Sequence, residues 1–189
     1  KEDGNYKLAV EKGTVSLTGQ GISTEGLSYF DIVSRSAKLE GEIAGQADVK
    51  VVAGQNDYDL SSRQHTTRAT GDGHTPDVAI DGRAMGSMYG GKIQLISTES
   101  GAGVRHEGSI IATGDIEISA NGDVTLTGLR SDKNVTVSGN NIALNKNSSG
   151  TGSAEAQNNI ILHALSGMTV NNDVISRNGT IRIDASTLL

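Results

Sequence analysis

The chain has 189 residues, enough for one domain with a continuous core, and it carries no cysteine, which excludes disulfides and thiolate chemistry. Its net charge of −6 and scattered Lys and Arg residues argue against a nucleic-acid partner, because duplex binding needs a basic face. Aromatic residues make up only 3% and there are 25 glycines, so the composition favours a narrow core layered with Val, Ile and Leu.

The N-terminal third contains short runs in which apolar and polar residues alternate. This pattern predicts strands with one buried face at residues 14–18 and 27–33, and two more strands within 37–54 that are joined by a corner at Gly45. Tyr29 and Phe30 lie together in the second run, and we interpret them as a local plug of the core rather than a ligand-stacking pair.

Residues 54–77 break this rhythm, since they are polar and contain no Val or Ile. We interpret them as an excursion from the coil path, either an exposed loop or a hairpin with arms at 58–60 and 65–69, and we favour the hairpin. Asn56, Asp57, Asp59 and Asp72 resemble fragments of an oxygen-rich calcium loop, but no complete calcium-binding pattern is present.

After residue 92 the chain becomes a regular repeat. The segments IQLIS, DIEIS, NVTVS, NIILH and TIRID align with starts at Ile93, Asp115, Asn134, Asn159 and Thr180, and the first alignment is left open by one residue. The mean spacing is about 20 residues, which is typical of solenoid coils. Second strands follow at 124–126, 142–144 and 168–170, and no segment has helical periodicity.

These repeats predict an all-β fold, a right-handed parallel β-helix that occupies residues 1–189 as a single unit. About eight coils would form a rod about 40 Å long. Apolar side chains should stack in columns such as Ile116, Val135, Ile160 and Ile181. Asparagines at the corners should form turns and amide ladders; they are Asn121, Asn140, Asn141, Asn171 and Asn172. Neither end shows a capping helix.

The sequence offers little that indicates catalysis. Four carboxylates could approach one another across stacked coils, but scattered acids are also expected on a solvated face: Asp81, Glu99, Glu107 and Asp115. Four histidines lack zinc-site spacing: His65, His74, His106 and His163. We interpret Arg105-His106-Glu107 as an exposed turn. We therefore predict no catalytic, cofactor or metal site, and a protein that is not an enzyme.

No apolar run approaches the length of a membrane span, and residues 1–10 do not resemble a signal peptide. The chain begins without Met in polar sequence. We interpret it as a fragment of a longer protein whose targeting signal lies upstream.

Two blocks, residues 26–56 and 78–110, carry a family resemblance. The matching elements are Ser34 and Arg35, Gly54 and Asn56, the turn containing Gly86, Met88, Tyr89 and Gly91, the pair Thr98 and Glu99, and Gly103 with Arg105. These blocks resemble the haemagglutination-activity region of two-partner-secreted exoproteins, which include filamentous haemagglutinins, secreted haemolysins and toxin-delivery proteins of contact-dependent growth inhibition. Ser87 and Gly90 depart from the GGMYAG turn that is more usual in that family.

The resemblance implies that residues 14–128 are the C-terminal part of a secretion domain and that 129–189 are generic fibre repeats. It also implies a secreted, cell-surface exoprotein that is exported by an outer-membrane transporter partner through an NPNG-like motif upstream of this chain. The expected role is a monomeric structural and interaction module without cofactors, serving adhesion to receptors on host or neighbouring bacterial cells, or toxin presentation.

Two other functions stay open. One is a carbohydrate-binding or carbohydrate-cleaving β-helix, which the low aromatic content disfavours. The other makes residues 54–77 a receptor-binding loop.

Overall fold

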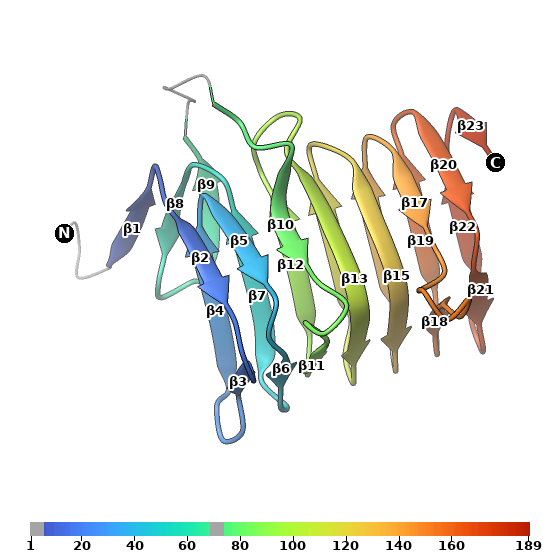
Figure 1. The fold of residues 1–189 in the computed structure, drawn as a ribbon, viewed down its shortest axis with the longest axis horizontal. Coiled ribbons are helices and arrows are strands. Elements are labelled where there is room, and N and C mark those ends of the chain that lie inside the picture. Colours follow the sequence, from blue (N-terminus) through green and yellow to red (C-terminus); the bar gives the residue numbers. More distant parts are fainter. Residues whose placement is uncertain (1–5, 69–73) are drawn as a thin grey trace.

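The computed structural model describes residues 6–68 and 74–189, which form strands, turns and loops without a helix. The strands stack as successive coils of a parallel β-helix, with β2 (Thr14–Leu17) near one end of the stack and β23 (Thr187–Leu188) at the other (Figure 1). This confirms the fold class that the repeats predict. None of the described residues belongs to a helix able to cross a membrane.

One side of the coil stack is a seven-stranded parallel sheet. Its neighbours, in spatial order from the C-terminal end, are β22 (Ile181–Asp184), β19 (Ile160–Ala164), β16 (Val135–Gly139), β14 (Ile116–Ala120), β12 (Ile93–Ser97), β7 (Asp48–Ala53) and β4 (Tyr29–Ser34). Successive coils therefore contribute one strand each to this sheet.

The second sheet is longer and bent, and each coil contributes one or two strands to it. Its main path is β2 (Thr14–Leu17), β5 (Ser36–Leu39), β10 (Val78–Gly82), β13 (Gly103–Ala112), β15 (Val124–Ser131), β17 (Ile142–Leu144), β20 (Gly167–Val170) and β23 (Thr187–Leu188). Shorter strands pair beyond the bend: β3 (Ile22–Ser23), β6 (Ile43–Ala44), β11 (Met88–Gly90), β18 (Ser153–Ala156) and β21 (Asp173–Ser176).

The expected apolar column is present in register. Ile116 pairs with Val135, Val135 with Ile160, and Ile160 with Ile181. Ile93 pairs with Ile116, one residue beyond the alignment start at Asp115, and with Val49 on its other side, which extends the column towards Phe30. The register follows the buried side chain rather than the first residue of each segment, because a shift by one residue would turn the apolar face outward.

The core lies between the two sheets and consists of aliphatic residues and two methionines, as the composition indicates. Phe30 packs against this core but Tyr29 is 52% exposed, so the pair is only partly the plug that we predict. A single coil buries little apolar surface on its own, so the hydrophobic core forms only when coils stack on one another.

Asparagines connect adjacent coils at the corners, as predicted. Asn141 Nδ2 donates to Asp123 Oδ1 (2.9 Å) and Asn171 Nδ2 donates to Asn145 Oδ1 (3.1 Å). A second column, which the sequence reasoning missed, runs through Asn134 and Asn159, each bonded to the coil before it or after it.

The excursion at residues 54–77 contains the hairpin that we favoured. Strands β8 (Asn56–Asp59) and β9 (Gln64–Thr67) pair antiparallel, and β1 (Lys7–Val10) adds to β8 as a third antiparallel strand. Residues 69–73, which include the end of the expected second arm and Asp72, lie outside the described residues.

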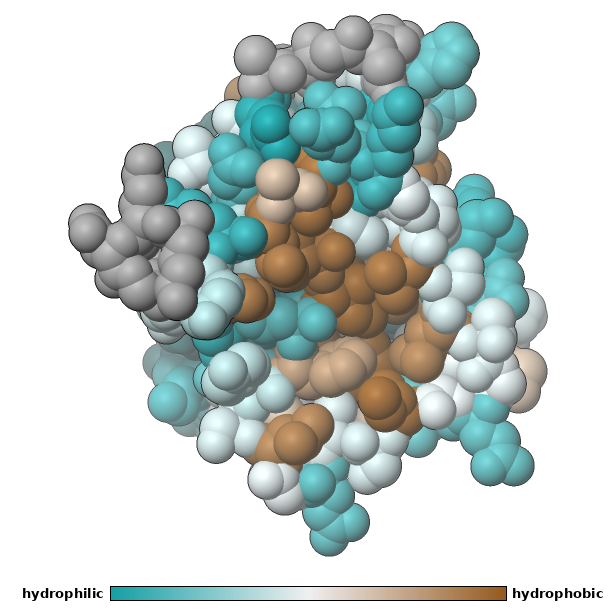
Figure 2. Space-filling view, turned by 90° about the vertical axis from the view of Figure 1, so that its left-hand side faces the viewer, coloured by the Kyte–Doolittle hydropathy of each residue, from teal (hydrophilic) through white to brown (hydrophobic). Residues whose placement is uncertain are grey.

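The N-terminal face of the stack exposes apolar side chains in a central patch surrounded by polar residues (Figure 2). The first coil contributes Val15 and Ile22, which are 38% and 37% exposed. Ile181 and Leu188 in the last coil are 44% and 56% exposed. Both ends of the stack thus present sheet edges and apolar surface, as an open solenoid does.

Candidate functional site: a corner cluster and a docked hairpin

The corner cluster forms where β4, β7 and β12 end side by side. Ser34 pairs with Ala53, and Ala53 pairs with Ser97, so the residues that follow these strands share one corner. Six of the family-motif residues lie there: Ser34, Arg35, Gly54, Asn56, Thr98 and Glu99. The structure therefore brings together residues that are widely separated in the sequence.

A buried ion pair lies at the centre of this cluster. The Arg35 guanidinium donates two hydrogen bonds of 3.1 Å to the carboxylate of Glu99, whose side chain is fully buried. Arg35 also donates to the carbonyl of His74 (2.7 Å). A bidentate pair in such surroundings is strongly directional, and removal of one partner leaves an uncompensated buried charge.

Close packing explains the glycine of this corner. Gly54 has φ of 125°, and a Cβ there would lie 2.2 Å from Thr98 Oγ1. Thr98 Oγ1 donates to the carbonyl of Ala53 (3.2 Å), and Asn121 donates to the carbonyl of Thr98 (2.7 Å). Asn56 is fully buried beside Gly54. The corner is thus a fixed connection between coils.

The other six motif residues do not form one cluster, because they are spread along the length of β13 on the bent sheet. Gly103 and Arg105 lie at the start of this strand, beside β10, while Met88 and Tyr89 pair with its end. Arg105 donates two hydrogen bonds of 2.9 Å to Asp81 in the preceding coil. Met88 is fully buried, whereas Tyr89 is 37% exposed. The glycines sit where neighbouring coils approach closely. A Cβ would lie 2.1 Å from the carbonyl oxygen of Leu39 at Gly86, 2.4 Å from that of Asp123 at Gly103, and 2.5 Å from the Asp48 side-chain Oδ1 at Gly91.

His106 corrects one interpretation from the sequence. Arg105-His106-Glu107 is part of strand β13 rather than an exposed turn, and His106 is only 1% exposed. Its Nδ1 and Nε2 lie 3.1 Å and 3.0 Å from the carbonyl oxygens of Gly108 and Gly86. Burial lowers the pKa of His106, although the two carbonyls oppose this effect. Alternation of side chains along a strand was the signal that places His106 inside and its neighbours outside.

A second cluster, which the sequence does not reveal, fixes the hairpin to the outer face of β4 and β7. Asp31 accepts hydrogen bonds from Arg63 Nε (2.9 Å) and Nη2 (2.6 Å) and from the hydroxyl of Tyr58 (2.6 Å). Lys50 donates to the carbonyl of Arg63, and the Arg63 guanidinium stacks 4.5 Å from the Tyr29 ring. The exposed ring of Tyr29 therefore has a partner in the hairpin.

Burial under the hairpin changes the titration of these groups. It lowers the pKa of Lys50, which is only 6% exposed, and together with the Asp31 hydrogen bond it raises the pKa of Tyr58. The lone lysine within the apolar run of β7 was the only sequence signal for this cluster.

The structure does not assemble the four carboxylates into an acid–base pair. Asp81 is paired with Arg105, Glu99 with Arg35, and Asp115 accepts from Asn134 (2.9 Å). Glu107 is exposed on β13. Asn56, Asp57 and Asp59 belong to strand β8 rather than a calcium loop. No group of three metal-ligating side chains occurs within residues 6–68 and 74–189.

Comparisons with known proteins agree on one class. A model of the TPS secretion domain family matches residues 1–126. The chain belongs to this family. Its members are structural secretion domains, and they occur in secreted, surface-exposed exoproteins of two-partner secretion systems.

Individual relatives also belong to the two-partner secretion exoproteins. Filamentous hemagglutinin of Bordetella pertussis is 41% identical over 130 residues, which cover 65% of this chain and 4% of that protein. The tRNA nuclease CdiA of Yersinia mollaretii is 30% identical over 182 residues, covering 96% of this chain and 5% of that protein. The crystal structure of a filamentous hemagglutinin secretion domain superposes with a TM-score of 0.60 at 28% identity, covering 98% of this chain and 56% of that one.

The chain thus spans only a few per cent of the length of these two full-length relatives. The nuclease activity in the name of the Yersinia mollaretii protein describes that whole protein, whereas the part shared with this chain is a secretion domain.

Proposed function

We propose that the chain forms the end of a secretion domain and the first coils of the rod that follows it, with a boundary near residue 128. The observation that supports this boundary is the family match, which ends at residue 126. The strands nevertheless pair without interruption through both parts, from β4 to β22 in one sheet. Each coil offers the next one a complete strand edge, so folding outside the cell can proceed coil by coil as the chain emerges from the transporter.

The rod presents a distal function, either adhesion to host or neighbouring cells or delivery of a toxin. The two alternatives are separated with the whole exoprotein expressed together with its transporter. Adhesion predicts attachment of producing cells to a host-cell layer, and toxin delivery predicts growth inhibition of neighbouring bacteria that lack immunity.

Export itself is tested by recovery of the whole exoprotein from the medium with and without the transporter. The proposal predicts recovery only when the transporter is present, and loss of recovery when residues 78–110 are deleted. Replacement of residues 129–189 by other coils of the same exoprotein should preserve export. Retention inside the cell after that replacement would contradict the proposed boundary.

The docked hairpin is a second candidate for receptor contact, because β9 lies at the edge of its sheet with Gln64, Thr66 and Thr67 exposed. Its complete deletion would uncover Lys50, so surface substitutions are the sharper test. Gln64→Ala combined with Thr66→Ala should remove cell attachment if the hairpin binds a receptor, and unchanged attachment would exclude this role.

A further inference from the structure

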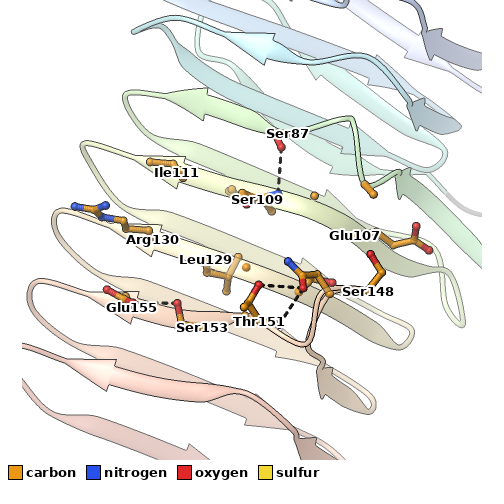
Figure 3. A pocket seen from close by; sticks show the side chains of 17 residues that line it. Ser87, Glu107, Ser109, Ile111, Leu129, Arg130, Ser148, Thr151, Ser153 and Glu155 are labelled. Atoms are coloured by element: carbon orange, nitrogen blue, oxygen red, sulfur yellow. Dashed lines mark hydrogen bonds between the residues drawn. The ribbon is translucent and has the colours of Figure 1, made fainter.

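A groove of about 470 Å³ crosses the outer surface of the bent sheet (Figure 3). Its floor is formed by β13 and β15, and it is flanked by Ser87 from the coil before and by the 145–152 loop from the coil after. The volume lies within the range of about 300–1,000 Å³ that is usual for small-molecule sites. We name this feature the hydroxyl groove.

An irregularity in β13 makes the sheet bend here. The register between β13 and β15 shifts between His106 and Ser109, so β13 carries one extra residue at this position. Such bulges bend a strand and redirect its side chains, and they are frequent beside functional sites. The buried ring of His106 contacts the carbonyls of Gly86 and Gly108, which fixes the bend from the inside.

The floor of the groove is flat because it contains a glycine, which has no side chain to fill the space above the sheet. Gly128 lies in the middle of β15, and a Cβ placed there would meet nothing closer than Ser109 Oγ at 3.5 Å. A side chain at this position therefore fits without disturbing the backbone, yet the natural residue leaves the space open. Ile111, partly buried at one end of the floor, adds a small apolar surface.

Side-chain hydroxyls line the groove, and charges lie only at its two ends. Ser109, Thr127 and Ser148 make no side-chain hydrogen bond within the described residues, so their hydroxyls can both donate and accept. Glu107 lies near one end of the groove, while Arg130 and Glu155 lie together near the other (Figure 3).

From this combination we propose that the hydroxyl groove binds a short stretch of an uncharged oligosaccharide. Sugar hydroxyls, like those of serine and threonine, are both donors and acceptors, and the Glu107 carboxylate can accept from two adjacent sugar hydroxyls. The uncharged centre of the groove matches a ligand that carries no charge of its own.

The pairing of the floor strands disfavours a peptide ligand. A peptide that binds as an added strand needs an unpaired edge, but β13 is paired with β11 and β15, and β15 is paired with β18 on its other side. The backbone groups of the floor are thus already used. A nucleic acid is disfavoured by the net charge of −6.

The inference goes beyond the secretion and rod role and does not depend on it. Sugar binding is measured on the purified 189-residue chain, whereas export is measured on the whole exoprotein with its transporter. Either result can therefore fail without the other.

The test is a titration of the isotope-labelled chain with chitotetraose, cellotetraose and lacto-N-tetraose, followed in amide correlation spectra. We expect at least one sugar to shift the amides of Ser109, Gly128 and Ser148 with a Kd of about 1 mM. Gly128→Leu should fill the floor and weaken binding at least ~10-fold. Thr136→Leu, which places the same leucine side chain on the outer face of the other sheet, should bind as the unchanged chain does.

Glu107→Gln supplies a second variant that leaves the fold intact, because Glu107 is exposed. It should weaken binding about threefold to tenfold, since a charged hydrogen-bond acceptor is replaced by a neutral amide. The proposal is overturned if none of the three sugars shifts these amides, if the shifts lie outside the groove, or if both variants retain full affinity.

Discussion

The coils up to β13 and the coils from β14 onward share one fold but are held together differently. In the first part, side chains connect positions far apart in the chain, since Arg35 and Glu99 are 64 residues apart and Asp31 and Arg63 are 32 apart. In the second part, the corner asparagines bond mainly to the neighbouring coil, as Asn134, Asn159 and Asn141 do at separations of 19 to 26 residues. Asn172 is an exception, because it also donates to the carbonyl of Thr127, 45 residues earlier.

This difference separates two kinds of solenoid stability. Where bonds join mainly neighbouring coils, each later coil contributes a similar increment to the free energy of unfolding, and the increments add, as expected for generic repeats. The buried ion pairs and the docked hairpin make the earlier coils depend on one another. We infer that the coils up to β13 are the cooperative part of this chain and that the coils from β14 onward are the modular part.

Glu99→Ala should have the largest effect, because it leaves the Arg35 guanidinium buried without its partner. We expect the free energy of unfolding to fall by about 3–5 kcal/mol, measured by urea denaturation. Glu107→Gln is the matched control, since it changes an exposed carboxylate and should alter stability by less than about 0.5 kcal/mol. Equal loss in both variants would show that the buried pair contributes nothing particular.

Asp31→Ala should be the next largest change. It removes the acceptor for Arg63 and Tyr58, each a hydrogen bond to a charged group, and should lower stability by about 2 kcal/mol. The loss should be accompanied by faster proteolysis at the β8–β9 turn, because the hairpin is released. Unchanged proteolysis would mean that β1 alone holds the hairpin in place.

The buried histidine predicts a dependence on pH. Because burial lowers the pKa of His106, the unfolded chain binds a proton before the folded chain does as the pH falls below about 6.5. Stability should therefore decrease from pH 6.5 towards pH 5, with a slope of up to about 1.4 kcal/mol per pH unit from this group. Asp81 and Glu155, whose pKa values are also lowered, add a loss of the same sign at lower pH, near 4 and below.

His106→Gln should reduce this slope even if it lowers stability at pH 7. His65 is the necessary comparison, because burial lowers its pKa as well. If melting curves of His65→Asn lose the slope and those of His106→Gln keep it, the pH dependence belongs to the hairpin instead.

The smallest effect is expected in the modular part. Asn159→Ala removes hydrogen bonds to the backbone and side chain of Thr180 and should cost about 1 kcal/mol. The loss should stay local, so the urea midpoint of the earlier coils should not change. A larger or global loss would show that the corner ladder, rather than the ion pairs, determines cooperativity.

The fold was predictable because its signal is local and repeated. The apolar column through Ile116, Val135 and Ile160 follows directly from the alternation of apolar and polar residues within short segments. Only the alignment of the segment at Ile93 could not be fixed from the sequence, and the strand pairing determines it. The hairpin arms were visible as a break in that alternation.

The side-chain clusters were not predictable in the same way, because their members meet only after coils have stacked. Nothing near Asp31 in the sequence indicates Arg63, and β1 pairs with β8 across almost 50 residues of chain. The family resemblance selected Arg35 and Glu99 as motif residues, but only the structure shows that they form one ion pair.

The division between a cooperative and a modular part is tested most directly by amide hydrogen exchange of the 189-residue chain and of Glu99→Ala, resolved by peptide. We predict that the variant exchanges faster throughout residues 28–112, including strands that do not touch Glu99, while β16, β19 and β22 keep the protection of the unchanged chain. Faster exchange confined to the residues around Glu99, or spread equally over all coils, would contradict the account.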